Sequence, residues 1–341
     1  MTSGGPSRST KAARIVRILA RAVRSRSYGA GSARRPASYH TRMTTHGFTL
    51  TAEGPFDFGA ALRFVEDWPA TGGLPSDGRA LRFAYCAESD WLPIGVTVTA
   101  APGGVAVATT RAAGPRVRDE VARILSLDVD GTGFAEIAEA DPVLGDLRLR
   151  SPGLRPVCFW SPWEAACWAV IVQRSSMVVA ARLKQRIAER YGARVTLDGR
   201  TYWAFPPPVT LVEAGGLGLP AQKEEWLRGL ARAALDGVLT AEHLRALAPE
   251  EALAELRALP GVGPFSAGLI LIRGAGAPDA FPGDEPRLFA ILREAYGLPE
   301  DAPPAAYRKL ADGWRPYRSW ASFLFRATAY GVVDQRNPAR D

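Results

Sequence analysis

A Gly-Val-Gly turn between two helical segments is the feature of this sequence that most constrains its fold. It lies in the stretch LPGVGPFSAGLILIRG, residues 259–274. Pro249 opens the first helix, whose leucines recur at helical spacing, and residues 260–263 end it. Pro264 then takes the first position of a second helix, where a missing backbone N–H is tolerated. The pattern predicts two helices joined by a tight turn.

The same turn is a candidate phosphate site. Glycine permits positive φ angles and leaves backbone N–H groups uncovered, so Gly261, Val262 and Gly263 can present donors beside a helix N-terminus. A contact of this kind needs no side chain and reads the backbone of a nucleic acid rather than its sequence. Gly-rich corners are also common in helical proteins, so a purely structural corner in an all-α scaffold is the alternative.

Charge is distributed unevenly along the chain. Residues 1–52 carry ten Lys or Arg and no Asp or Glu, whereas residues 53–150 have a net charge of −6 and residues 151–341 a net charge of +3. The composition predicts a disordered basic arm over residues 1–46, rich in Arg, Ser, Ala and Gly. Three interpretations of this arm stay open: an organelle transit peptide, sequence upstream of a start at Met43, or an arm that tethers DNA.

Two regions follow the arm. Short β-branched alternations with Gly and Pro between them, mixed with helical periods, predict a small antiparallel α+β domain over residues 47–150. The helical period then dominates, which predicts an all-α region over residues 151–341. A helix start in that region is indicated by Ser161, Pro162 and Glu164, which combine a cap, a first-position proline and a third-position acid.

The cysteines and histidines exclude several classes of site. Cys86, Cys158 and Cys167 form no CxxC pair, and the three histidines are scattered, so no metal site and no cofactor are predicted. A monovalent cation in the hairpin would bind backbone carbonyls and leave no side-chain trace. No run of 18 apolar residues occurs, so no membrane span is predicted. The cysteine usage favours reduced thiols in a cytoplasmic protein.

The downstream sequence resembles a known superfamily. The matching pieces are LPGVGPFSAGLILIRGAG, PDAFPGDEPRL, WRPYRSWASFLFRATAY and, upstream, PWEAACWAVIVQRSSMVVAARL. In this order they resemble the helix-hairpin-helix (HhH-GPD) DNA glycosylases, and within them the 3-methyladenine DNA glycosylase II (AlkA-like) branch, over residues 47–335. The resemblance implies a mainly α fold, with helix-hairpin-helix glycosylase domains preceded by a small antiparallel α+β (TBP-like) domain.

The resemblance also implies a catalytic acid in the loop after the hairpin, and two acids compete for the role. The family's acid is normally Asp, which favours Asp284. The register favours Glu285, which lies twenty residues after Phe265 and three before Leu288. Pro286 suits a first helical position, so Glu285 is expected at the cap, where the positive helix end would keep it ionised. Glu285 is the preferred catalytic residue and Asp284 the alternative.

The reaction expected from the resemblance is hydrolysis without lyase chemistry. Lyase members place a lysine just after the hairpin to attack the sugar, and residues 260–273 contain none. The chain is therefore expected to be a monofunctional DNA glycosylase that starts base excision repair. It would release 3-methyladenine or 7-methylguanine from double-stranded DNA by flipping the base out of the stack.

Further site residues are carried over by the resemblance. Phe265 is expected to line the base pocket and attract a cationic base through cation–π contact. Trp320 is a second candidate, although core packing would also explain it. Arg326 stands where the family often has an aromatic, and a cation there disfavours a cationic base.

The remaining candidates are DNA contacts. Arg174 is expected to intercalate, with Gln173 and Ser176 beside it, although Arg174 would serve equally as a phosphate contact. In the hairpin, Ser266 joins the Gly-Val-Gly backbone as a DNA-binding residue.

Two departures from the family pattern, Glu285 and Arg326, leave a second interpretation open. It is a DNA-binding protein of the same fold whose catalysis is lost or altered. In either case we expect a monomeric, nucleoid-associated cytoplasmic protein that binds double-stranded DNA with damaged bases and no membrane.

Overall fold

The computed structural model describes residues 46–71, 74 and 77–329. The predicted basic arm therefore lies outside the described residues, apart from its last residue, His46. Within the described residues no helix is long and apolar enough to cross a membrane.

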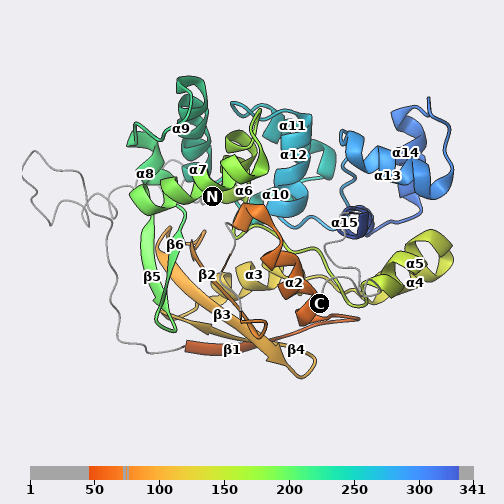
Figure 1. The fold of residues 1–341 in the computed structure, drawn as a ribbon, viewed down its shortest axis with the longest axis horizontal. Coiled ribbons are helices and arrows are strands. Elements are labelled where there is room, and N and C mark those ends of the chain that lie inside the picture. Colours follow the sequence, from red (N-terminus) through yellow and green to blue (C-terminus); the bar gives the residue numbers. More distant parts are fainter. Residues whose placement is uncertain (1–45, 72–73, 75–76, 330–341) are drawn as a thin grey trace, which may run out of the picture.

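The chain opens with an antiparallel sheet that carries two helices on one face (Figure 1). Its strands run in the order β1-β4-β3-β2. The strands are β1 (His46–Thr51), β2 (Ala80–Cys86), β3 (Pro93–Ala101) and β4 (Gly104–Thr109), and the helices are α2 (Phe58–Glu66) and α3 (Pro115–Ile124). Alternate residues of β4 are buried, as expected for a sheet with one covered face. This confirms the small antiparallel α+β part of the predicted fold.

A helical layer covers the other side of α2 and α3. It consists of α6 (Pro162–Ile171), α7 (Met177–Tyr191), α8 (Pro208–Glu213), α9 (Ala221–Leu235), α10 (Ala241–Ala246), α11 (Pro249–Arg257), α12 (Pro264–Leu269) and a π-helical turn, η2 (Ile270–Gly274). The predicted start of α6 is confirmed, since the Ser161 hydroxyl accepts from the backbone N–H of Glu164. Pro249 and Pro264 begin α11 and α12 as predicted.

A β-hairpin interrupts the region predicted to be all-α. Strands β5 (Ala193–Leu197) and β6 (Arg200–Ala204) pair antiparallel and pack beside β2 and β3. The all-α description of residues 151–341 is therefore wrong at this point. The sequence held the signal: Asp198 and Gly199 both adopt positive φ between two alternating segments, as a two-residue hairpin turn requires.

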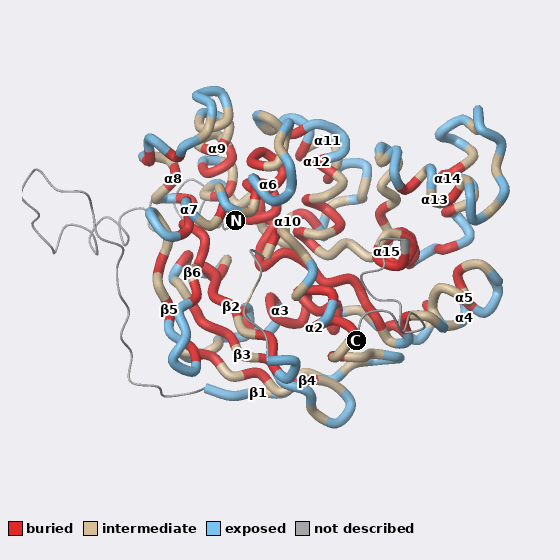
Figure 2. Tube along the Cα trace, in the orientation of Figure 1, coloured by how far each residue is buried: buried red, intermediate tan, exposed pale blue. Residues whose placement is uncertain are grey.

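The last helices return to the first half of the chain. Helices α13 (Pro286–Tyr296), α14 (Pro304–Asp312) and α15 (Arg318–Ala329) share one hydrophobic core with the sheet, α2, α3 and the pair α4 (Thr132–Ala140) and α5 (Pro142–Arg150). A second core is formed by the helices from α6 through η2 together with the β5–β6 hairpin. The two cores therefore do not divide at the predicted boundary near residue 150. Helix α15 is buried along almost its whole length (Figure 2), and its buried apolar side chains belong to the first of these cores.

Candidate active site

A cavity of about 140 Å³ opens between α11, α12, η2, the loop before α13 and one face of α15. A cavity of about 150 Å³ accepts a benzene ring, so the space suits a planar ring. Both sequence-predicted acids line it, together with Phe265 and Arg326. The hairpin and the carboxylates are thus brought together, as the sequence interpretation required.

The π-helical turn sets the inner wall of the cavity. Wide turns of this kind occur mostly as single bulges and often at functional sites. Here the turn directs Arg273 into the cavity, where its Nε donates to the Val157 carbonyl oxygen at 2.8 Å. Burial lowers the pKa of Arg273 to about 10, so its guanidinium stays charged at neutral pH. The sequence interpretation did not identify this residue.

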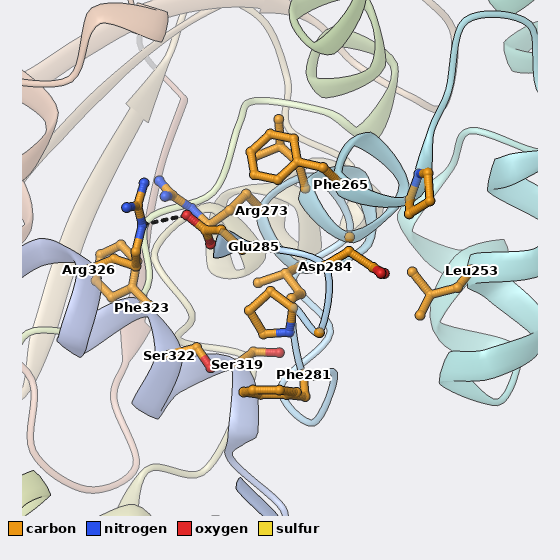
Figure 3. A pocket seen from close by; sticks show the side chains of 16 residues that line it. Leu253, Phe265, Arg273, Phe281, Asp284, Glu285, Ser319, Ser322, Phe323 and Arg326 are labelled. Carbon is orange, nitrogen blue, oxygen red and sulfur yellow. Dashed lines mark ion pairs between the residues drawn. The ribbon is translucent and has the colours of Figure 1, made fainter. Parts of the chain in front are cut away.

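Glu285 occupies the cap position of α13, as predicted, but its side chain forms no capping hydrogen bond. It turns into the cavity instead, where Oε1 lies 2.8 Å from Nε of Arg326 (Figure 3). Only 12% of the side chain is exposed. Burial raises the pKa of Glu285, and the guanidinium groups of Arg326, Arg287 and Arg273 oppose that rise in this order. The expectation that the positive helix end keeps this carboxylate ionised stays a prediction, since burial acts on its pKa in the opposite direction.

Asp284 points the other way. Its carboxylate lies on the side of Leu253, away from Glu285 (Figure 3), and is 3.9 Å from Arg257 Nη2. Its side chain is 48% exposed. The two adjacent acids thus occupy different environments, one at the rim of the cavity and one inside it.

Of the predicted aromatic residues, one lines the cavity and one does not. Phe265 lies at the mouth and is 50% exposed. Trp320 is buried in the first core against Phe134 and Tyr317, with its ring under the Arg155 guanidinium. Its assignment to the base pocket is therefore wrong. Helix α15 instead presents a different face to the cavity, formed by Ser319, Ser322, Phe323 and Arg326.

The hairpin turn has the predicted geometry at one glycine only. Gly261 adopts φ +75°, and a Cβ there would lie 2.7 Å from the Trp226 ring. Gly263 has a negative φ and faces open space, so it leaves the backbone at the start of α12 uncovered. The side chains of Val262 and Ser266 are buried, so any DNA contact from these two residues would come from the backbone.

The segment before α7 is fastened to the hairpin. Nε2 of Gln173 donates to the Gly261 carbonyl oxygen at 2.7 Å, which gives Gln173 a bracing contact in addition to any with DNA. Arg174 is exposed and adopts φ +52°. Ser176 caps α7 by accepting from the Val179 N–H. Lys223, which the sequence interpretation missed, donates to the carbonyl oxygens of Ile171 and Gln173 and holds the same turn.

No group of three or more His, Cys, Asp or Glu side chains in the described part of the chain is arranged to hold a metal ion. What the cavity offers is a buried carboxylate, two guanidinium groups and aromatic walls beside the helices of the hairpin. Within the turn itself the N–H of Val262 donates to the Leu259 carbonyl oxygen, so it is not a free donor.

Several known proteins are similar to this chain in sequence. No family model matches the sequence. The sequence is 28% identical over 222 residues to "DNA-3-methyladenine glycosylase" of Bacillus subtilis (strain 168), covering 62% of this chain and 73% of that protein. It is 35% identical over 184 residues to "DNA-3-methyladenine glycosylase 2" of Escherichia coli (strain K12), covering 52% of this chain and 61% of the relative.

A solved structure has the same fold. The structure described as "3-methyladenine dna-glycosylase from Archaeoglobus fulgidus" superposes with a TM-score of 0.69 at 22% identity, covering 83% of this chain and 99% of the other. The fold is therefore that of the helix-hairpin-helix DNA glycosylases. In sequence the chain is similar to the 3-methyladenine DNA glycosylases, on the 3-methyladenine DNA glycosylase II (AlkA-like) side of that superfamily.

Proposed function

We propose that this protein is a monofunctional DNA glycosylase that binds damaged double-stranded DNA and hydrolyses the N-glycosidic bond of a modified base. The observation that carries the proposal is the cavity that Glu285 and Phe265 both line, next to Pro264, which directly follows the Gly261–Gly263 turn. An enzyme that acts on a base must take it out of the stack, and a cavity next to a phosphate-binding turn is suited to receive it.

Glu285 is the proposed catalytic acid. An oxocarbenium-like sugar is stabilised by a nearby ionised carboxylate, and the same group can orient the attacking water. The carboxylate of Glu285 is held at a fixed place by Arg326, at 2.8 Å, so it meets the sugar without reorganising. Asp284, half-exposed at the rim, is the alternative acid.

The extruded nucleotide needs a partner to fill the gap it leaves. Arg174 stands exposed in a turn braced to the hairpin by Gln173 and Lys223. These contacts keep Arg174 in a fixed position relative to the proposed phosphate-binding turn. When the turn binds the DNA backbone, the base is then placed correctly for the reaction.

Lyase chemistry is not part of the proposal. A Schiff base requires a lysine amine at the sugar, and no lysine is among the residues that line the cavity. The expected product is therefore an abasic site with an intact strand.

The test is a release assay on duplexes that carry single modified bases, including 3-methyladenine and 7-methylguanine. Glu285→Gln should lower the single-turnover rate by about 100-fold or more, whereas Asp284→Asn should change it much less. A reversed order would assign the chemistry to Asp284. Strand cleavage without a separate base treatment would contradict the monofunctional assignment.

One observation favours a second candidate function. Arg326 forms an ion pair with the carboxylate of Glu285, the proposed catalytic group. The site therefore also fits a DNA-binding protein of the same fold with lost or altered catalysis. Binding is measured against salt concentration, since phosphate contacts give a steep slope. Intact, salt-dependent binding with no release of any base would favour this candidate.

A further inference from the structure

The interior of the cavity carries more positive than negative charge. Arg273 reaches it from η2 and Arg326 from α15, and Glu285 lies between them (Figure 3). Arg326 and Glu285 are ion-paired at 2.8 Å and are neutral as a unit. Arg273 donates to the carbonyl oxygen of Val157, which is a neutral acceptor. The pair together with Arg273 therefore leaves an excess of one positive charge.

Asp284 does not cancel this excess. Its side chain is 48% exposed, lies 3.9 Å from Arg257 and points toward Leu253. Exposed charges at the rim are screened by water and salt, whereas buried charges are screened much less. The electrostatics inside the cavity are thus set by Arg273, Arg326 and Glu285.

One aromatic wall of the cavity already holds a cation. The guanidinium carbon of Arg273 lies 5.0 Å from the ring centre of Phe323, which lines the cavity, and 4.3 Å and 5.1 Å from the rings of Trp68 and Phe64 behind it. Cation–π attraction is the means by which an aromatic cavity would favour a positively charged base. Here the Phe323 ring is engaged by a resident guanidinium, which would repel such a base.

The charge of the base decides what its departure requires. In the hydrolysis, a water oxygen bonds to C1′ of the sugar, and the electron pair of the C1′–N bond leaves with the base. A base made cationic by alkylation departs as a neutral molecule, and the proton lost by the water goes to solvent. A neutral base departs as an anion and takes up one proton, which balances the proton lost by the water. Positive charge beside the base therefore assists only the second case.

On the basis of the proposed glycosylase function, we infer that Arg326 and Arg273 select neutral modified purines over purines made cationic by alkylation. Arg326 is the specificity-determining residue that separates the two classes, because it adds a guanidinium to the face of α15 that borders the base. Phe265, at the mouth, contributes a ring to bases of either charge.

The experiment uses the full chain and duplexes that differ only in the lesion. One duplex carries 1,N6-ethenoadenine, which is neutral, and the other carries 7-methylguanine, which is cationic. Each single-turnover rate is divided by the uncatalysed release rate of the same lesion. The wild type should enhance release of the neutral lesion more. Arg326→Met, which keeps the aliphatic stem, should lower the ratio of the two enhancements at least about tenfold.

Two variants serve as controls. Arg200→Met removes the same charge from an exposed position at the start of β6 and should leave the ratio unchanged. Arg326→Lys keeps the charge and should retain most of the preference. The measured quantity is the ratio of the two enhancements. Loss of the ion pair also alters Glu285, but that effect slows the release of both lesions alike and leaves the ratio unchanged.

Two results would overturn the inference. If the wild type enhances 7-methylguanine release more, or if Arg326→Met slows both lesions equally, the selection rule is wrong while the glycosylase function stands. If neither lesion is released from DNA that the protein binds, the proposed function fails and the inference fails with it.

Discussion

At the scale of single residues, the chemistry of the site depends on how Glu285 is held. Its carboxylate is largely withdrawn from water, which favours the neutral form, and it contacts a guanidinium, which favours the ionised form. Asp284, one residue earlier, is half-exposed and lies 3.9 Å from Arg257. Adjacent positions in the sequence thus place their carboxylates in different environments, one largely withdrawn from water and one half-exposed.

This arrangement predicts an acid limb in the rate of base release. If ionised Glu285 is the active form, the rate falls as the pH drops through the pKa of Glu285, which burial raises above the value of an exposed glutamate. Arg326→Met should move that limb to higher pH, because it removes the nearest opposing charge. Single-turnover rates at closely spaced pH values measure both limbs. A limb that does not move in the variant would show that another group titrates.

At the scale of elements, the α11–α12 hairpin is fixed by contacts that its own sequence does not contain. Gly261 lies against Trp226 of α9, and its carbonyl oxygen accepts from Gln173 before α7. Lys223 on α9 holds the same segment by two backbone carbonyls. Helix α9 and the segment before α7 thus position the turn that is proposed to grip the DNA backbone.

A matched pair of glycine substitutions tests this placement. Gly261→Ala introduces a Cβ at positive φ and within 2.7 Å of Trp226, so it should lower the unfolding free energy by about 1–3 kcal/mol and weaken DNA binding. Gly263→Ala has open space and a negative φ, so its stability should stay within about 0.5 kcal/mol of wild type. Urea denaturation of both variants measures the difference. Equal losses would mean that the turn is not held against α9.

At the scale of the whole molecule, the sheet and the helical layer are joined by a buried polar network. The hydroxyl of Tyr85 on β2 donates to Glu120 on α3 at 2.6 Å, and the backbone N–H of Glu88 donates to the other oxygen of Glu120 at 2.9 Å. The carboxylate of Glu88 accepts from the N–H of Ala241 at the start of α10. Burial, and then the charge of Glu88, raise the pKa of Glu120 to about 7.

The raised pKa makes the stability of the fold depend on pH. A carboxyl group whose pKa is higher in the folded state stabilises the fold while it is protonated, and that contribution is lost as the pH rises through the folded-state pKa. The unfolding free energy should therefore decrease as the pH rises from about 4.5, the ordinary pKa of a glutamate, to about 7, the pKa of Glu120 in the folded state, and level off above it. Glu120→Gln, which cannot ionise, should flatten this dependence. An unchanged slope in the variant would assign it to other groups.

The sequence by itself determined the local structure and the resemblance to the helix-hairpin-helix glycosylases. Pro249, Pro264 and Pro286 each begin a helix where the pattern predicted one, because caps and first-position prolines act within a single turn. The glycine turn and the position of Glu285 at the start of α13 are also local. The β5–β6 hairpin could have been predicted as well, because Asp198-Gly199 is a typical two-residue hairpin turn.

Only the tertiary structure decided which side chains meet in the cavity. The face that α15 turns toward the cavity depends on its packing in the first core, so Arg326 enters the site and Trp320 does not. Arg273 reaches the cavity because η2 widens to a π turn, which the sequence pattern had predicted as ordinary helix. Helical periodicity gives the spacing of side chains along a helix. The rotation of that helix relative to distant elements is set by the packing of the whole core.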